Sequence, residues 1–226
     1  MNRTTSERLF EHFCDARGIV CHRVPEAKSR TPDYELVFGN VRVVVEVKEI
    51  TANAKEQESD RLLAQRGYGA ALSSTPGDRV RKKIADCSAQ LKARTQGIHP
   101  SLLVVFDRGR IVGHVDAYNI RVAMYGLEQI YVAVPPIGRG SPHATGIGHG
   151  PKRKMTATDN TSISAIGALV MTGRDATHLF MYHNVFARVP LEPTLLGPLG
   201  VPQFEIGAPT TGGASEWREV ALSHEP

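Results

Sequence analysis

Three residues whose side chains could hydrolyse a phosphodiester lie close together in the chain. Asp33 follows Pro32, and after twelve intervening residues the chain reads Glu46-Val47-Lys48. Phosphodiester hydrolysis needs a metal ion on the phosphate, an activated water and relief of charge in the transition state. Mg²⁺ keeps several of its waters and takes few protein oxygens, so two carboxylates suit it. The spacing predicts a metal site with Asp33, Glu46 and the Val47 carbonyl as ligands, and with Lys48 beside the metal-bound water.

The pattern around these residues predicts that two paired strands present them. Residues 41–50 alternate, with valine at positions 41, 43, 45 and 47 and with Glu46 and Lys48 on the other face. Gly39-Asn40 offers turn chemistry, and residues 34–38 form the preceding strand, with Asp33 at its start. Taken alone, Glu-x-Lys on a strand more often lines a solvated face, so the interpretation depends on the surrounding elements.

Those elements alternate between helix and strand. Residues 6–17 have helical spacing, with Thr5 or Ser6 as the expected cap and Gly18 at the end. Further helices are expected at 53–66, 78–95 and 117–126, and further strands at 19–24, 101–107, 129–134, 163–171 and 178–188. This order predicts an α/β fold in which a mixed central β-sheet is flanked by helices.

Residues 6–48, SERLFEHFCDARGIVCHRVPEAKSRTPDYELVFGNVRVVVEVK, resemble the core of the PD-(D/E)XK, or restriction-endonuclease-like, nuclease superfamily. In that family a helix bearing a glutamate leads into a β-meander that presents an Asp and a Glu-x-Lys. The resemblance implies a restriction-endonuclease-like core, a Mg²⁺ (or Mn²⁺) cofactor, and catalytic roles for Asp33, Glu46 and Lys48. It assigns the helix-borne acid to Glu7, with Glu11 as the competing choice.

The resemblance extends more loosely to residues 78–107. The helix that follows the catalytic strand would be 78–95, and its Gln90 resembles a glutamine that supports the site in some members. Residues 49–77 then form an unusually long insertion. The superfamily includes restriction, repair and recombination enzymes as well as inactive members, so the fold does not name a substrate.

Two basic segments are candidates for contact with a phosphate backbone. The helix 78–95 carries six Lys or Arg, at positions 79, 81, 82, 83, 92 and 94, which its periodicity turns mainly outward. A second group lies at 152–154. A solvated helix face and a disordered loop are the competing interpretations. The predicted nucleic-acid-binding residues are Arg79, Lys82, Lys83, Lys152, Arg153 and Lys154.

Composition and segment chemistry suggest one domain over residues 1–190. Within it, 135–162 is rich in Pro and Gly and is expected to be a long loop, and 191–226 is expected to be a Pro/Gly-rich C-terminal tail. The 226 residues carry a formal charge of +4, and the three cysteines match no disulfide or zinc pattern. Without an apolar leader or a bilayer-length apolar run, we expect a cytoplasmic protein that does not engage a membrane.

The sequence therefore predicts a Mg²⁺-dependent nuclease of restriction, repair or defence type, with nucleic acid, and DNA in particular, as its partner. Two alternatives stay open: an inactive nuclease-fold module that binds nucleic acid or protein, and an α/β protein whose Asp…Glu-x-Lys is coincidental. A homodimer is a candidate assembly. The sequence does not distinguish DNA from RNA or exonuclease from endonuclease.

Overall fold

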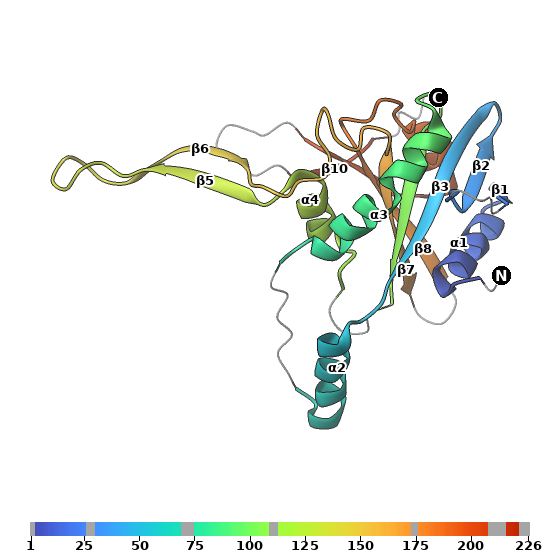
Figure 1. The fold of residues 1–226 in the computed structure, drawn as a ribbon, viewed down its shortest axis with the longest axis horizontal. Coiled ribbons are helices and arrows are strands. Elements are labelled where there is room, and N and C mark those ends of the chain that lie inside the picture. Colours follow the sequence, from blue (N-terminus) through green and yellow to red (C-terminus); the bar gives the residue numbers. More distant parts are fainter. Residues whose placement is uncertain are drawn as a thin grey trace.

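A computed structural model describes residues 3–25, 30–68, 75–108, 113–172, 176–207 and 216–221. These form a mixed α/β fold built on an eight-stranded sheet in the order β1-β2-β3-β4-β7-β8-β9-β10 (Figure 1). The helices are α1 (Thr5–Ala16), α2 (Ala54–Arg66), α3 (Asp78–Thr95) and α4 (Ala117–Tyr125), with 3₁₀ turns at Pro193–Leu195 and Gly197–Leu199. The strands are β1 (Val20–Arg23), β2 (Tyr34–Phe38), β3 (Val41–Ile50), β4 (Ser101–Asp107), β5 (Glu128–Ala133), β6 (His143–His149), β7 (Ala165–Thr172), β8 (Ala176–His183), β9 (Gln203–Ile206) and β10 (Trp217–Glu219).

The sheet begins as an antiparallel meander, is parallel from β3 to β7, and mixes both pairings beyond β7. β1 pairs with β2 and β2 with β3 in antiparallel fashion, whereas β3–β4 and β4–β7 are parallel. A parallel neighbour requires a crossover connection, and α2 and α3 lie in the connection from β3 to β4. The predicted mixed sheet flanked by helices is confirmed, and the predicted bounds of β2, β3, α3 and β4 match the structure.

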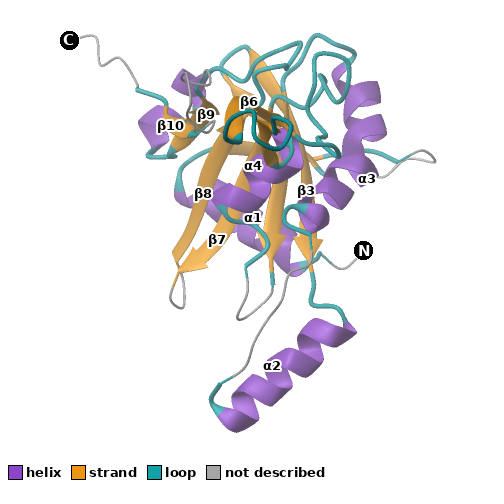
Figure 2. Cartoon of the chain, turned by 90° about the vertical axis from the view of Figure 1, so that its left-hand side faces the viewer, coloured by secondary structure: helices purple, strands orange, loops and turns teal. Residues whose placement is uncertain are grey.

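Each face of the sheet carries its own core, and β3 contributes to both because its side chains alternate. Val43, Val45 and Val47 pack into the cluster that includes Phe10 and Phe13 of α1. Val44 and Ile50 belong to the opposite cluster, which contains the buried residues of α3 and α4. Glu46 and Lys48 share the parity of Val44, so β3 presents them toward the α3 side of the sheet. Figure 2 shows α3 beside the sheet, near β3.

Helix α1 begins one residue earlier than its sequence suggests. Thr4 is the N-cap, and a capping box joins its side chain to the Glu7 backbone and the Glu7 side chain to the Thr4 backbone. The prediction of Thr5 or Ser6 as the cap is wrong, because a glutamate three residues after the cap favours Thr4. Ser6 is instead buried and donates its backbone N–H to Glu49 Oε2 at 3.1 Å.

Helix α2 lies within the predicted insertion 49–77 and stands away from the two cores (Figure 1). None of its side chains is buried. Glu56 ties it to the body, accepting from Arg79 Nη1 at 3.3 Å and lying 3.1 Å from His114 Nε2. The helix therefore depends on a few polar contacts rather than on packing.

Residues 135–162 are not the irregular loop that their Pro and Gly content suggests. β6 lies inside this range and pairs antiparallel with β5, so that the two strands form a ribbon extending from the body, called here the arm (Figure 1). Pro and Gly lower local strand propensity, yet cross-strand hydrogen bonds to β5 order the segment. The arm exposes several large apolar side chains, among them Ile130, Tyr131, Val132 and Ile147.

The prediction that residues from 191 onward form a C-terminal tail outside the domain is also wrong for residues 191–207. Leu191, Leu196 and Val201 are buried in the cluster on the α1 side, and β9 pairs in parallel with β8. Apolar residues spaced among prolines and glycines show no period, so only the tertiary contacts reveal that they belong to the core. No described helix is long and apolar enough to cross a membrane.

Candidate active site

The meander brings Asp33 against the strand that carries Glu46 and Lys48. Tyr34 pairs with Val45 at the start of β2, which places Asp33 level with the next residues of β3. There the Val47 backbone N–H donates to Asp33 Oδ2 at 2.8 Å. The carboxylate is thus held against the backbone between Glu46 and Lys48, and the three predicted residues come together where β2 begins.

Glu46 is the buried centre of this group, with its side chain 2 % exposed. Its Oε1 accepts from Lys48 Nζ, while Oε2 has no hydrogen-bond partner within the described chain. A buried carboxylate oxygen without a partner costs free energy, because nothing replaces the water lost on burial. An oxygen kept in this state is suited to a ligand that arrives later, such as a metal ion.

The charges of the site act on one another. Burial, followed by the negative charge of Asp33, raises the pKa of Glu46, while Lys48 and the Gln90 side chain oppose this rise. The pKa of Asp33 is raised by burial as well, against the Val47 N–H and the charge of Lys48. Burial alone would lower the pKa of Lys48, yet Glu46 and Asp33 together raise it. Two crowded carboxylates and one ammonium therefore share a partly desolvated space.

Glu7 approaches the site from α1 on the other side of the sheet. Its Oε2 accepts from the Thr4 backbone N–H at 2.6 Å, and its Oε1 lies 3.3 Å from Arg23 Nη2. Its charge raises the pKa of Asp33. Glu11, the competing choice, points elsewhere, accepting from Tyr34 Oη at 2.9 Å. Of the two acids Glu7 is the one near Asp33, although its carboxylate is engaged in capping and in an ion pair.

One stripe of α3 covers the α3 side of the site. Lys83, Cys87 and Gln90 recur at spacings of four and three residues, which places them on one helix face. Gln90 and Cys87 are buried. Burial and the charge of Glu46 raise the pKa of Cys87 to about 12. Burial lowers the pKa of Lys83, and the positive charge of Lys48 lowers it further. The structure thus brings Gln90 to the site despite the insertion between it and Lys48.

The donor set fits a magnesium-type ion better than a protein-caged metal. No group of three or more His, Cys, Asp or Glu in the described ranges is arranged to hold a metal. Asp33 and Glu46 together with a backbone carbonyl would leave about half of an octahedral shell to water, and Mg²⁺ in proteins commonly keeps several of its waters. The unpartnered Oε2 of Glu46 supplies an open ligand position. The residues present therefore fit Mg²⁺ or Mn²⁺.

The predicted nucleic-acid contacts on α3 divide into different environments. Arg79 turns to Glu56 and to the Thr51 carbonyl, so an internal partner holds it. Lys82 is exposed, and Lys83 is half-buried beside the site. Arg81, expected to face outward, is buried and donates to the Pro76 carbonyl at 2.8 Å. The helical period predicts an outward Arg81 because it counts only polarity. A guanidinium can be buried where backbone carbonyls accept its hydrogen bonds.

The second basic group lies apart from the metal-site residues, beside α4. The backbone N–H groups of Lys154 and Met155 donate to the Met124 carbonyl at 3.1 and 2.8 Å, and Met155 is fully buried. Lys152 and Arg153 are exposed, and Lys154 is half-buried. The segment is therefore anchored rather than free, and it presents its first two cations to solvent.

Two residues near the site, Arg23 and Cys87, are not among the candidates that the sequence suggests. Arg23 pairs with Glu7 and lowers the pKa of Asp33, and Cys87 lies near both Glu46 and Lys48. Cys87 occurs at helical spacing from Gln90, which is a usable signal once Gln90 is placed. Arg23 lies on a four-residue strand with no pattern of its own, so only the pairing of β1 with β2 could place it.

No protein-family model matches the chain, and no curated protein or solved structure matches it either.

Proposed function

We propose that the protein is a Mg²⁺- or Mn²⁺-dependent nuclease that hydrolyses phosphodiester bonds of nucleic acid, with DNA as the expected substrate. The observation that carries the proposal is the convergence of Asp33, Glu46 and Lys48, in which a buried carboxylate oxygen is left without a partner. A coincidental Asp…Glu-x-Lys has no reason to keep such a costly arrangement.

The order of elements supports the same proposal. Helix α1 leads into the meander β1-β2-β3, and α3 then returns the chain to β4, parallel to β3. This is the arrangement that the resemblance to the PD-(D/E)XK superfamily implies for the helix-borne acid, the Asp and the Glu-x-Lys. The helix α2 and the arm are additions outside that order.

The residues divide the work between holding the metal and handling the water. Asp33 and Glu46 Oε2 would hold the ion, which when bound supplies Lewis acidity and lowers the pKa of a water. Lys48, kept protonated by Glu46 and Asp33, places positive charge beside the scissile phosphate and donates a hydrogen bond to it or to the attacking water. Gln90 positions Glu46 from α3, and Glu7 with Arg23 flanks Asp33 from the other side.

The test is cleavage of single- and double-stranded DNA and RNA with Mg²⁺ or Mn²⁺, with and without EDTA. We expect Asp33→Asn and Lys48→Ala to abolish cleavage while the variants stay folded by circular dichroism. Glu35→Gln is the matched control, because Glu35 lies two residues from Asp33 on β2 but pairs with Arg94 and Arg42. Equal cleavage by wild type and by either site variant would contradict the proposal. Binding of nucleic acid without cleavage would favour the inactive module.

A further inference from the structure

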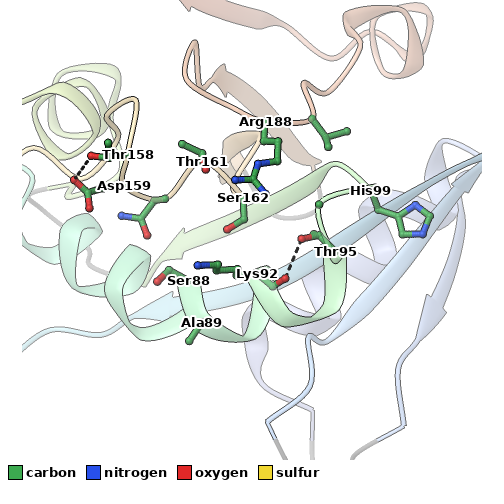
Figure 3. A pocket seen from close by; sticks show the side chains of 13 residues that line it. Ser88, Ala89, Lys92, Thr95, His99, Thr158, Asp159, Thr161, Ser162 and Arg188 are labelled. Atoms are coloured by element: carbon green, nitrogen blue, oxygen red, sulfur yellow. Dashed lines mark hydrogen bonds between the residues drawn. The ribbon is translucent and has the colours of Figure 1, made fainter.

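A concave site that does not include the metal-site residues lies on α3. It is a cleft of about 390 Å³ between the second half of α3, the segment 158–162 and residues 188–189. Figure 3 shows Ser88 and Lys92 on the helix, with Thr161, Ser162 and Arg188 on the opposite side. The volume is in the range of small-ligand sites, but the lining is polar instead of apolar.

The chemistry of the lining suits an anion. Hydroxyl groups come from Ser88, Thr95, Thr158, Thr161 and Ser162, and two cations come from Lys92 and Arg188. Neither cation has an ion-pair or hydrogen-bond partner for its side chain among the described residues. Asp159 is the single acid among the described residues of the lining, and its Oδ2 accepts from the hydroxyls of Thr156 and Thr158 at 2.9 and 3.4 Å. The two cations outnumber the acid, so the described residues of the lining carry a net positive charge.

The wall opposite α3 is fixed by hydrogen bonds, so the cleft exists before any ligand arrives. Arg188 donates its backbone N–H to the Thr161 carbonyl at 2.7 Å. Ser101 Oγ donates to the Ser162 carbonyl at 2.6 Å, which fastens the segment to β4. A preformed site loses less entropy on binding than one that must be ordered.

The cleft lies close to the proposed active site but is separate from it. Ser101, which holds its wall, pairs with Val44, two residues before Glu46 on β3. At about 3.3 Å per strand residue this is roughly 7 Å along the strand. Helix α3 carries both sites, with Gln90 beside Glu46 and Lys92 in the cleft. A polymer bound at Glu46 could therefore extend to the cleft.

We propose that this cleft binds a phosphate group of the nucleic acid strand outside the scissile position. Arg188 and Lys92 contact the phosphate oxygens, and hydroxyls such as those of Ser88 and Ser162 complete the shell. The claim that this phosphate belongs to a nucleic acid strand rests on the proposed function, whereas the affinity of the cleft for phosphate does not. The cleft would then fix the register of the strand on the active site.

The experiment uses the full chain in EDTA, so that no metal contributes to binding. Inorganic phosphate, thymidine monophosphate and thymidine are titrated by calorimetry, and a short single-stranded DNA then competes with the monophosphate. We expect both phosphate-bearing probes to saturate one site, and thymidine not to bind. Arg188→Gln and Lys92→Gln should each weaken phosphate binding by about tenfold or more, because each removes a charge-assisted hydrogen bond. Arg66→Gln, an exposed cation on α2, should not.

The outcomes separate this inference from the nuclease proposal. The proposal for the cleft fails if phosphate does not bind saturably, or if Arg188→Gln binds phosphate as tightly as the wild type. Binding of the monophosphate that DNA does not displace overturns it too, since the cleft would then serve a small molecule. If DNA displaces the monophosphate but the wild type cuts no nucleic acid, the cleft stands and the nuclease proposal fails.

Discussion

The buried carboxylate of Glu46 should cost the metal-free protein stability, and Glu46→Gln should recover it. The side chain is 2 % exposed and Oε2 has no partner in the described chain, a condition that costs about 1–3 kcal/mol. The amide lowers this cost because a buried neutral group is cheaper to desolvate than a buried carboxylate. Lys48 loses an ion pair in return, but that pair is worth at most about 1 kcal/mol because the Lys48 side chain is 30 % exposed. The net gain of about 1 kcal/mol corresponds to a rise in Tm of about 2–4 °C for a chain of this length.

The assay is thermal unfolding by calorimetry in EDTA and again in excess Mg²⁺. In Mg²⁺ the order should invert, because an ion at about ten times its Kd adds roughly 1.4 kcal/mol to the wild type and much less to the variant. The matched control is Glu35→Gln, which breaks the ion pairs with Arg94 and Arg42 and should lower Tm in both buffers. A lower Tm of Glu46→Gln in EDTA, or equal stabilisation of wild type and Glu46→Gln by Mg²⁺, would refute the reasoning.

The same variant has a defined pH dependence in the absence of metal. The folded pKa of Glu46 is raised above its ordinary value of 4.5, mainly by burial. A raised carboxyl pKa means that the folded state holds its proton longer, so stability is full below the unfolded pKa and falls as pH rises through the folded one. The advantage of Glu46→Gln over wild type should therefore grow as pH rises above 4.5 and vanish below it. A constant difference from acid to neutral pH would contradict this.

Other perturbations have equally definite outcomes. Lys48→Ala should reduce cleavage by at least about 100-fold, while the Mg²⁺-induced rise in Tm remains, since the carboxylates are untouched. Arg81→Ala should lower the free energy of unfolding by about 1–3 kcal/mol in chemical denaturation, because it removes a buried side chain together with its hydrogen bonds to the Pro76 and Val122 carbonyls, whereas exposed Lys82→Ala should change it by less than about 0.5 kcal/mol. Joining Ile130 to Ile147 through Asn-Gly, without residues 131–146, should shift Tm by less than about 2 °C, because the arm exposes its apolar side chains. Iodoacetamide should leave Cys87 unlabelled at roughly pH 8, because burial raises its pKa to about 12. Labelling of Cys87 itself in the folded protein, read by mass spectrometry, would contradict its placement.

The sequence by itself determined the elements whose pattern is local and strong. Alternation fixed β3 with Glu46 and Lys48 on one face, and it also indicated the valine face that packs on α1. The turn at residues 39–40 and the start of β2 placed Asp33 opposite them. Strand and helix periods depend only on neighbouring residues, so a chain read alone is enough to find them.

Tertiary structure decided everything that depends on a partner far along the chain. β6 is ordered by β5, and β9 by β8, although their own residues show no strand period. Arg81 is buried because α4 and the residue before Gly77 offer it carbonyls. Gln90 reaches Glu46 across the 49–77 insertion, and Lys92 and Arg188 line the same cleft, because α3 packs between segments distant in sequence. Local propensity carries no information on such contacts, since their free energy arises only when the sheet has assembled.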